Sequence, residues 1–377
     1  MNWLSHIIPN KNCFLGGDGG WLLIDFFAAA FAGSCFFFGP FILALALVPL
    51  FQALAHKFGI LDRPNGALKV HGQPTAYLGG VAIYCATLIT YIAVNFFIPQ
   101  VKIFSNPLVP LYGAGLTVLL VGGLIDDIFT ISPLKKLAIQ TIACLMFVKA
   151  GLVFKPMCLQ SLLPFLPQDP AFLAGLGIAL TLWWMLSIIN ALNLIDIMDG
   201  LATSVSWCAL VAMIGMGVAA PLPRSPMILL LVPFLGILAG FFLYNKPKAS
   251  IYLGDAGSLF LGGVLATMPF FMGWGQTTSW IVFIAPCCFL VVPIFELCSL
   301  MLIRAYLRIP VYHGSPHHFA IYFKRRGWST PTVLRVTGGV ALCGALVGLM
   351  CVGVPVPTGI ALGVLASAYF FLFFLCL

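Results

Sequence analysis

The chain has 377 residues, of which 62% are hydrophobic and only 7% are charged, and its formal net charge is +8. A water-soluble domain needs roughly 25% charged residues to cover its surface, so this composition excludes one. Most of the chain is therefore predicted to lie in lipid, where helices or closed barrels satisfy their backbone polar groups. Long apolar runs without a two-residue alternation favour helices.

Eleven apolar segments are long enough to cross roughly 30 Å of hydrocarbon as helices. They predict an all-α polytopic membrane protein with about eleven transmembrane helices, which form one membrane-embedded domain over residues 1–377. The N-terminal residues lack a basic region that leads into an apolar core, so no cleaved signal peptide is predicted. The segments lie at about 26–55, 78–100, 107–125, 137–153, 171–192, 201–220, 226–243, 257–274, 279–303, 333–352 and 357–376.

The lysines and arginines are divided unequally between the two predicted membrane faces. One face has thirteen and the other has five, and the positive-inside rule makes the richer face cytoplasmic. The N-terminal segment 1–25 is then periplasmic, and the loop 304–332 is cytoplasmic. Most acids also fall on the cytoplasmic face, although they did not enter the assignment, so we predict a site at the cytoplasmic helix ends. These acids are Asp62, Asp126, Asp127, Asp196, Asp199 and Asp255, with Glu296 in the ninth segment.

The loop between the third and fourth segments starts with two adjacent carboxylates, Asp126 and Asp127. Such neighbours repel each other unless a cation or a proton neutralises them. Mg²⁺ commonly takes one or two carboxylates and completes its shell with water and substrate phosphates. The pair therefore predicts a magnesium site, unless it only caps the next helix. Lys136 could serve a phosphate or anchor its helix at the headgroups.

The stretch NALNLIDIMDGLA, residues 190–202, places four polar residues at the end of an apolar segment. Asp196 and Asp199 are three residues apart, so both carboxylates lie on one side of a helix or a tight turn. Asn190 and Asn193 carry amides that are costly to bury unpaired. We expect these amides either to hold a ligand or to bond neighbouring helices.

Asp255 stands between Gly254 and Gly257, just before a new helix. Glycines permit close approach of the backbone, and a helix start offers free N–H groups to an anion. Asp255 is therefore either a site residue or a helix N-cap.

The loop 304–332 carries the cations and imidazoles that a diphosphate-bearing substrate needs, among them Arg308, His317 and His318. Adjacent histidines on a helix diverge by about 100° and rarely share one metal ion. Phosphate contacts are therefore favoured over zinc ligation. Alternatively, the loop anchors the protein to anionic lipids.

At these loops the sequence resembles the polyprenyl-phosphate N-acetylhexosamine-1-phosphate transferases, the family that starts lipid-linked glycan synthesis and includes the peptidoglycan translocase. The resemblance covers almost the whole chain, and its motifs in this order are highly specific. The matching stretches are DRPNGALKVHGQPTAYLGG (62–80), LIDDIF (124–129), KLAIQ (136–140), NALNLIDIMDGLA (190–202), YLGDAGS (252–258), preceded by Asn245, and GSPHHFAIYFKRRGWS (314–329).

The resemblance implies that undecaprenyl phosphate attacks the sugar-proximal phosphate of a UDP-N-acetylhexosamine at the inner membrane, giving the lipid diphospho-sugar and UMP. It implies Mg²⁺ or Mn²⁺ as the cofactor, and homodimers occur among relatives. No nucleic acid partner is expected. Asp255 would be a metal ligand with Asp127 or Asp126 beside it, and the other member of that pair would orient or deprotonate the lipid phosphate. The implied catalytic residues are Asp126, Asp127, Asp196 and Asp199, and the implied substrate-binding residues are Lys69, His71, Lys136, Asn190, Asn193, Asn245, Arg308, His317 and His318.

Three positions depart from the family pattern: Leu68, Ile197 and Glu296. Ile197 replaces a usual glycine, which should stiffen the turn between Asp196 and Asp199 and could alter activity. The alternatives are therefore the same chemistry on another UDP-sugar, a catalytically altered relative, or a cation-coupled transporter. A transporter usually has two repeated halves and charges near the midplane; no repeat is found, and the acids lie at one surface.

Overall fold

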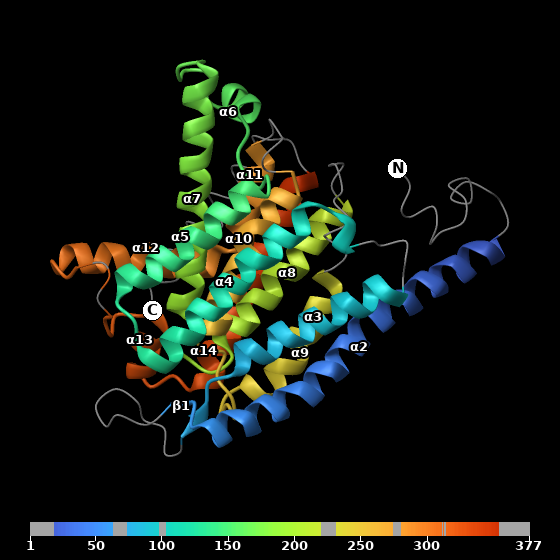
Figure 1. Ribbon diagram of the computed structural model, residues 1–377, viewed down its shortest axis with the longest axis vertical. Coiled ribbons are helices and arrows are strands. Elements are labelled where there is room, and N and C mark those ends of the chain that lie inside the picture. Colours follow the sequence, from blue (N-terminus) through green and yellow to red (C-terminus); the bar gives the residue numbers. More distant parts are fainter. Residues whose placement is uncertain are drawn as a thin grey trace.

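The computed structural model describes residues 19–62, 74–97, 103–219, 231–273, 280–310, 312 and 314–353. These residues are mostly helical, as predicted, and the helices pack into one bundle (Figure 1). The elements are α2 (Gly19–Phe58), β1 (Leu61–Asp62), β2 (Thr75–Ala76), α3 (Gly79–Phe97), the 3-10 turn η2 (Ile103–Ser105), α4 (Leu108–Phe129), α5 (Pro133–Lys149), α6 (Pro156–Leu162), α7 (Pro170–Ile195), α8 (Leu201–Ala219), α9 (Leu231–Asn245), α10 (Gly254–Phe271), α11 (Trp280–Phe289), α12 (Val291–Tyr306), α13 (Phe319–Arg325) and α14 (Thr330–Gly353).

Ten of the eleven predicted segments overlap described helices, and the eleventh, 357–376, lies outside the described residues. Five described helices are long and apolar enough to cross a membrane, or six if one bent pair is counted as a span. The chain is therefore a multi-pass membrane protein. The five are α2, α3, α4, α7 and α14.

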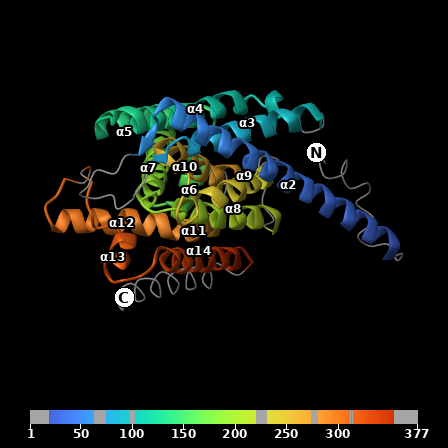
Figure 2. The same cartoon turned by 90° about the horizontal axis from the view of Figure 1, so that it is seen from below.

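The ninth predicted segment, 279–303, is two helices rather than one. α11 and α12 meet at Leu290 with a bend of 81°. Pro293 has no backbone N–H to offer the carbonyl of Phe289, which removes one helical hydrogen bond at the bend. Because of the bend, α12 projects from the side of the bundle (Figures 1 and 2).

α10 lies inside the bundle, between the layer of α3, α4 and α5 and the layer that contains α14 (Figure 2). It packs against α3, α4, α7 and α8, and nearly all of its side chains are buried. Glycines allow its backbone to approach α3 closely. A Cβ atom on Gly80 would lie only 2.1 Å from the backbone nitrogen of Gly257. A helix that is apolar all round is expected to be buried in this way.

A short antiparallel pair of strands, β1 and β2, positions the N-terminal end of α10. Leu61 pairs with Ala76, and Ala76 also bridges to Ile251 just ahead of α10. The backbone of Gly80 donates to the carbonyl of Leu253 over 3.0 Å. The start of α3 and the start of α10 are therefore fixed side by side.

Candidate functional site

The ends of four helices meet around one lysine. Lys136, in the first turn of α5, donates through Nζ to Asp255 Oδ2 (2.7 Å) at the start of α10. The same Nζ lies 2.9 Å from Asp126 Oδ2 near the end of α4, and it donates to Asn193 Oδ1 (3.1 Å) near the end of α7. Four predicted residues from three separate loops are thus brought into one cluster, here called the Lys136 cluster: Asp126, Lys136, Asn193 and Asp255.

Both carboxylate oxygens of Asp255 are held by neighbouring side chains. Lys136 contacts Oδ2, and the amide of Asn193 donates to Oδ1 at 2.5 Å. The Asn193 amide also donates to Ser258 Oγ (2.9 Å), one turn further along α10. The carboxylate therefore has a fixed orientation, although about 30% of its side chain remains exposed.

Asp127 caps the N-terminus of α10 rather than that of α5, the next helix in the chain. Its Oδ1 accepts the backbone N–H of Asp255 (2.8 Å), and its Oδ2 accepts that of Ala256 (3.0 Å). These are free N–H groups in the first turn of α10, which attract a carboxylate. Gly254 makes room, because its φ is +72° and a Cβ there would lie 2.7 Å from Asp127 Oδ2. The end of α4 thus fixes the start of α10.

Asp126 supports the turn between α4 and α5. Its Oδ1 accepts the N–H of Ile131 at 2.8 Å, and its Oδ2 faces Lys136. The chain reverses there through Thr130, which has a left-handed backbone with φ +49°. The two adjacent aspartates therefore have different partners.

Asp196 and Asp199 follow the end of α7. Burial raises the pKa of Asp196 well above its usual value, and the negative charges of Asp255, Asp127 and Asp199 raise it further. Asp196 therefore lies within electrostatic reach of the Lys136 cluster. Asp199 is engaged elsewhere, because its Oδ2 accepts the backbone N–H groups of Lys248 and Ala249, both at 3.1 Å.

Ile197 imposes no backbone strain on the turn between these aspartates. It is not among the residues with positive φ, and Gly200 provides the left-handed position of the turn with φ +73°. The side chain of Ile197 packs against the apolar core. The stiffening predicted for this turn is therefore not accompanied by backbone strain at Ile197.

Asn190 bonds a neighbouring helix, which was one of the two alternatives for it. Its Nδ2 donates to Gln140 Oε1 (2.8 Å), and Gln140 Nε2 donates back to Asn190 Oδ1 (3.3 Å). Gln140 is fully buried on α5 and was not among the predicted site residues. The signal that points to it is its place in the KLAIQ stretch, one turn after Lys136.

Asn245 joins α8 to the segment before α10. It is 3% exposed, accepts from Thr203 Oγ1 (2.9 Å) and donates to the carbonyl of Ile251 (3.0 Å). Its amide is therefore used in holding the fold, although the family resemblance implies a substrate contact.

Replacing Asn245 by Ala should lower stability by about 2 kcal/mol, because it leaves the buried hydroxyl of Thr203 and the carbonyl of Ile251 without this partner. Thermal unfolding in detergent would measure the loss. We expect the surviving folded protein to keep its KM for the nucleotide sugar that the family resemblance implies. A large rise in that KM at unchanged unfolding temperature would show that Asn245 contacts substrate instead.

The histidine loop makes its own set of contacts around α12. His318 Nδ1 lies 2.7 Å from Oε1 of the fully buried Glu296, and the Nε of buried Arg304 donates to Ser315 Oγ (3.1 Å). Arg308 is exposed and has a left-handed backbone, and His317 has one buried ring nitrogen, Nδ1, that lacks a hydrogen bond. Lys69 and His71 lie outside the described residues.

Two tyrosines beside the cluster were not predicted. The rings of Tyr77 and Tyr252 have centroids 6.0 Å apart. Burial raises the pKa of Tyr77, and the charges of Asp62, Asp127 and Asp255 raise it further, so its ring lies near these carboxylates. The signal in the sequence is a repeated Tyr-Leu-Gly triplet, at 77–79 and 252–254.

The donor set of the Lys136 cluster fits Mg²⁺. Asp126 and Asp255 provide carboxylate oxygens, and Asn193 provides an amide oxygen. Mg²⁺ is usually bound by one or two carboxylates together with water and substrate phosphates. Within the described ranges, no group of three or more His, Cys, Asp or Glu side chains is arranged to hold a metal ion.

A multi-pass helical membrane protein with a carboxylate and lysine cluster at its helix ends is equipped to bind phosphate groups and a cation at a membrane surface. Residues 109–273 match the model of glycosyl transferase family 4, and this range includes the whole Lys136 cluster. The chain belongs to glycosyl transferase family 4.

The chain is similar to two kinds of curated protein. It is 30% identical over 256 residues to the probable undecaprenyl-phosphate N-acetylglucosaminyl 1-phosphate transferase of Bacillus subtilis (strain 168), covering 67% of this chain and 66% of that protein, just under two thirds. It is 29% identical over 328 residues to the phospho-N-acetylmuramoyl-pentapeptide-transferase of Staphylococcus aureus (strain MSSA476), covering 82% and 94%. The corresponding Staphylococcus epidermidis protein is also 29% identical, over 324 residues.

Proposed function

We propose that the protein transfers N-acetylhexosamine 1-phosphate from a UDP-sugar to undecaprenyl phosphate and releases UMP. The observation that carries the proposal is the Lys136 cluster at the ends of four helices, within the part of the chain that matches the family. The relatives' names describe this reaction class, and the Bacillus relative favours N-acetylglucosamine as the sugar.

We place the reaction at the cytoplasmic face of the inner membrane, in a single domain of eleven transmembrane helices with the N-terminus outside. The excess of Lys and Arg on the face with the cluster supports this orientation. A cytoplasmic site also meets the chemistry, because nucleotide sugars are soluble whereas the acceptor keeps its tail in the bilayer.

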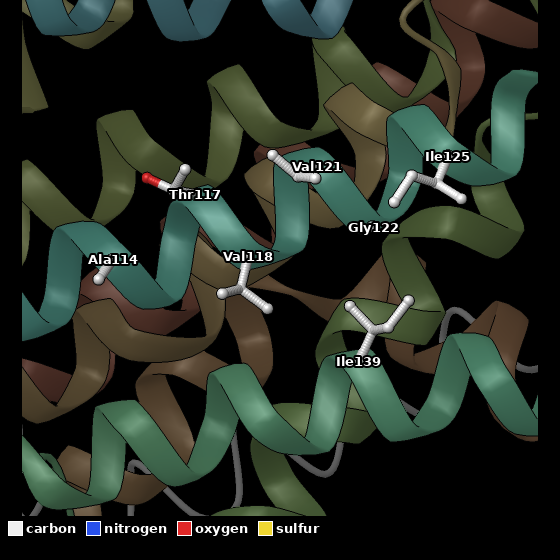
Figure 3. A pocket seen from close by; sticks show the side chains of 7 residues that line it. All are labelled: Ala114, Thr117, Val118, Val121, Gly122, Ile125 and Ile139. Carbon is white, nitrogen blue, oxygen red and sulfur yellow. The ribbon is translucent and has the colours of Figure 1, made fainter.

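An apolar groove runs along the outer side of α4 and α5 (Figure 3). Its volume is about 550 Å³, and at one end it reaches Ile125, the neighbour of Asp126, and Ile139, three residues after Lys136. The hydroxyl of Thr117 in its wall is already bonded to the carbonyl of Gly113. An apolar surface that extends to the end of α4 where Asp126 lies suits a reaction in which one substrate is a lipid.

In the proposed mechanism, Asp255 and Asp126 would hold the metal ion, and Asn193 keeps the Asp255 carboxylate in orientation. Bound Mg²⁺ would neutralise the diphosphate and stabilise the charge that develops on the UMP leaving group. Lys136 adds a further positive charge at the phosphates. An oxygen of the lipid phosphate attacks the sugar-proximal phosphorus, and the bond from this phosphorus to the oxygen of UMP breaks.

The phosphate of undecaprenyl phosphate, which is the attacking group, needs little help from a general base. A phosphate monoester has a second pKa near 6, so at neutral pH most of it is already ionised. The residues of the site therefore act chiefly by positioning and by charge compensation. Asp127, whose two oxygens accept backbone N–H groups, serves by fixing the start of α10.

The remaining predicted residues have supporting roles in this proposal. Asp196 borders the nucleotide, and Tyr77 with Tyr252 offers aromatic faces on which a base can stack. The loop with Arg308, His317 and His318 would contact the diphosphate, as would Lys69 and His71.

The decisive test is transfer by the purified protein. Incubation with undecaprenyl phosphate, Mg²⁺ and radiolabelled UDP-N-acetylglucosamine should move label into the lipid phase and release an equal amount of UMP. Other UDP-N-acetylhexosamines, tested in the same way, define the sugar. If no UDP-N-acetylhexosamine gives lipid-linked label, the proposed function is wrong.

A further inference from the structure

The position of Lys136 has a consequence for how the metal ion enters. Its ammonium is held by oxygens of Asp126, Asn193 and Asp255, all within 3.1 Å. Only 17% of the lysine side chain is exposed. One cation therefore already fills the centre of the oxygen donors that fit Mg²⁺.

The lysine is held there mainly by these oxygens. Lys136 lies in the first turn of α5, and Asp255 lies in the first turn of α10. These two helices direct the positive ends of their dipoles towards the cluster, whereas α4 and α7 end there and direct their negative ends towards it. Because the dipoles oppose one another, the ammonium is held chiefly by the carboxylates of Asp126 and Asp255, and a divalent cation can compete with it for these oxygens.

The oxygens left for a divalent ion are those that the ammonium contacts, because Asp255 Oδ1 accepts from Asn193 and Asp126 Oδ1 accepts from Ile131. Asp255 Oδ2 is one of them. Mg²⁺ binds carboxylate oxygens at about 2.0–2.1 Å. Lys136 Nζ is 2.7 Å from this atom, so the two charges would then repel each other strongly at short range. The lysine has a flexible four-carbon stem, so it can leave the carboxylate while its backbone stays in place.

We propose that Lys136 occupies the site in place of the metal ion, and that binding of a divalent cation displaces its ammonium from Asp255. The freed ammonium is then available to a substrate phosphate. Which phosphate binds the freed ammonium rests on the proposed function. The exchange of the ammonium for a divalent cation at Asp255 involves no substrate. It makes Lys136 a positioning residue that couples cation binding to phosphate binding.

The exchange can be tested with Mn²⁺ alone, using the electron paramagnetic resonance signal of free Mn²⁺ to titrate the purified protein. Lys136→Met removes the competing ammonium, so we expect it to bind Mn²⁺ about tenfold more tightly than the wild type. Lys135→Met is the matched control, because it removes the same charge from the neighbouring, exposed residue. Its Mn²⁺ affinity should stay within about twofold of the wild type.

A second measurement uses the wild-type protein and does not depend on the folding of a variant. Mg²⁺ should increase the rate at which an amine-acetylating reagent modifies Lys136 several-fold, as measured by mass spectrometry, with Lys135 as the internal reference. Equal Mn²⁺ affinities in the Lys136→Met and Lys135→Met proteins would overturn the proposal. So would acetylation of Lys136 that Mg²⁺ leaves unchanged or slows. Neither assay requires transfer of a sugar phosphate. A negative result here would therefore be distinguishable from a failure of the proposed transferase function.

Discussion

Replacing Asp255 by Asn is expected to reduce sugar-phosphate transfer by about a thousandfold or more while the helix bundle stays folded. The substitution removes the carboxylate charge that Lys136 and Asn193 hold in place. It keeps the size of the side chain, and it leaves the backbone N–H that Asp127 accepts. A hard divalent cation loses its best-oriented oxygen ligand, so Mn²⁺ binding should weaken together with turnover.

Asp169→Asn is the matched control for this prediction. Asp169 precedes α7 at the end opposite to Asn193, and its carboxylate accepts the N–H of Phe172 at 2.7 Å as the N-cap. The same chemical change there should leave turnover intact and cost a few tenths of a kcal/mol, because Asn is also a good N-cap. Transfer by Asp255→Asn within tenfold of the wild type would show that the cluster is not the reaction centre.

The helices could be predicted from the sequence because lipid imposes a simple rule on long apolar runs. Hydropathy depends on local composition, however, and the residues of α11 and α12 are apolar on both sides of Leu290. A missing N–H such as that of Pro293 favours a bend there but does not require one, since α2 and α10 continue through prolines, and a hydropathy window registers neither case. The short helix α13 was missed for a related reason, because it has only seven residues and ends in two basic ones.

The members of the site could be predicted, but most of their partners could not. Lys136, Asn193 and Asp255 were candidates because polar residues at the ends of apolar helices require an explanation, and they do meet. Which aspartate of the pair faces the start of α10 depends on how closely α4 approaches it. That approach needs Gly123, since a Cβ there would lie 2.3 Å from the carbonyl oxygen of Asp255. Such a contact has no signature in either segment alone.

Replacing Asp127 by Asn should reduce both stability and turnover, and this combination separates its role from that of Asp255. The Asn amide can present an oxygen to one of the two N–H groups at Asp255 and Ala256, but it places an NH₂ group against the other. Loss of an acceptor for one of these two helix N–H groups should lower the free energy of unfolding by about 2 kcal/mol. The start of α10 then shifts, and a small displacement of Asp255 should lower turnover by about a hundredfold.

The adjacent residue distinguishes a capping role for Asp127 from a direct one. Asp126→Asn keeps an oxygen for the N–H of Ile131 and loses the ion pair with Lys136, so thermal unfolding in detergent should show a smaller loss than for Asp127→Asn. If Asp127 instead acts on substrate or metal directly, its Asn variant would lose turnover at an unchanged unfolding temperature. We expect Asp127→Asn to lower both the unfolding temperature and turnover, and Asp255→Asn to lower turnover alone. That result would show that Asp127 positions the start of α10 and that Asp255 takes part in the reaction.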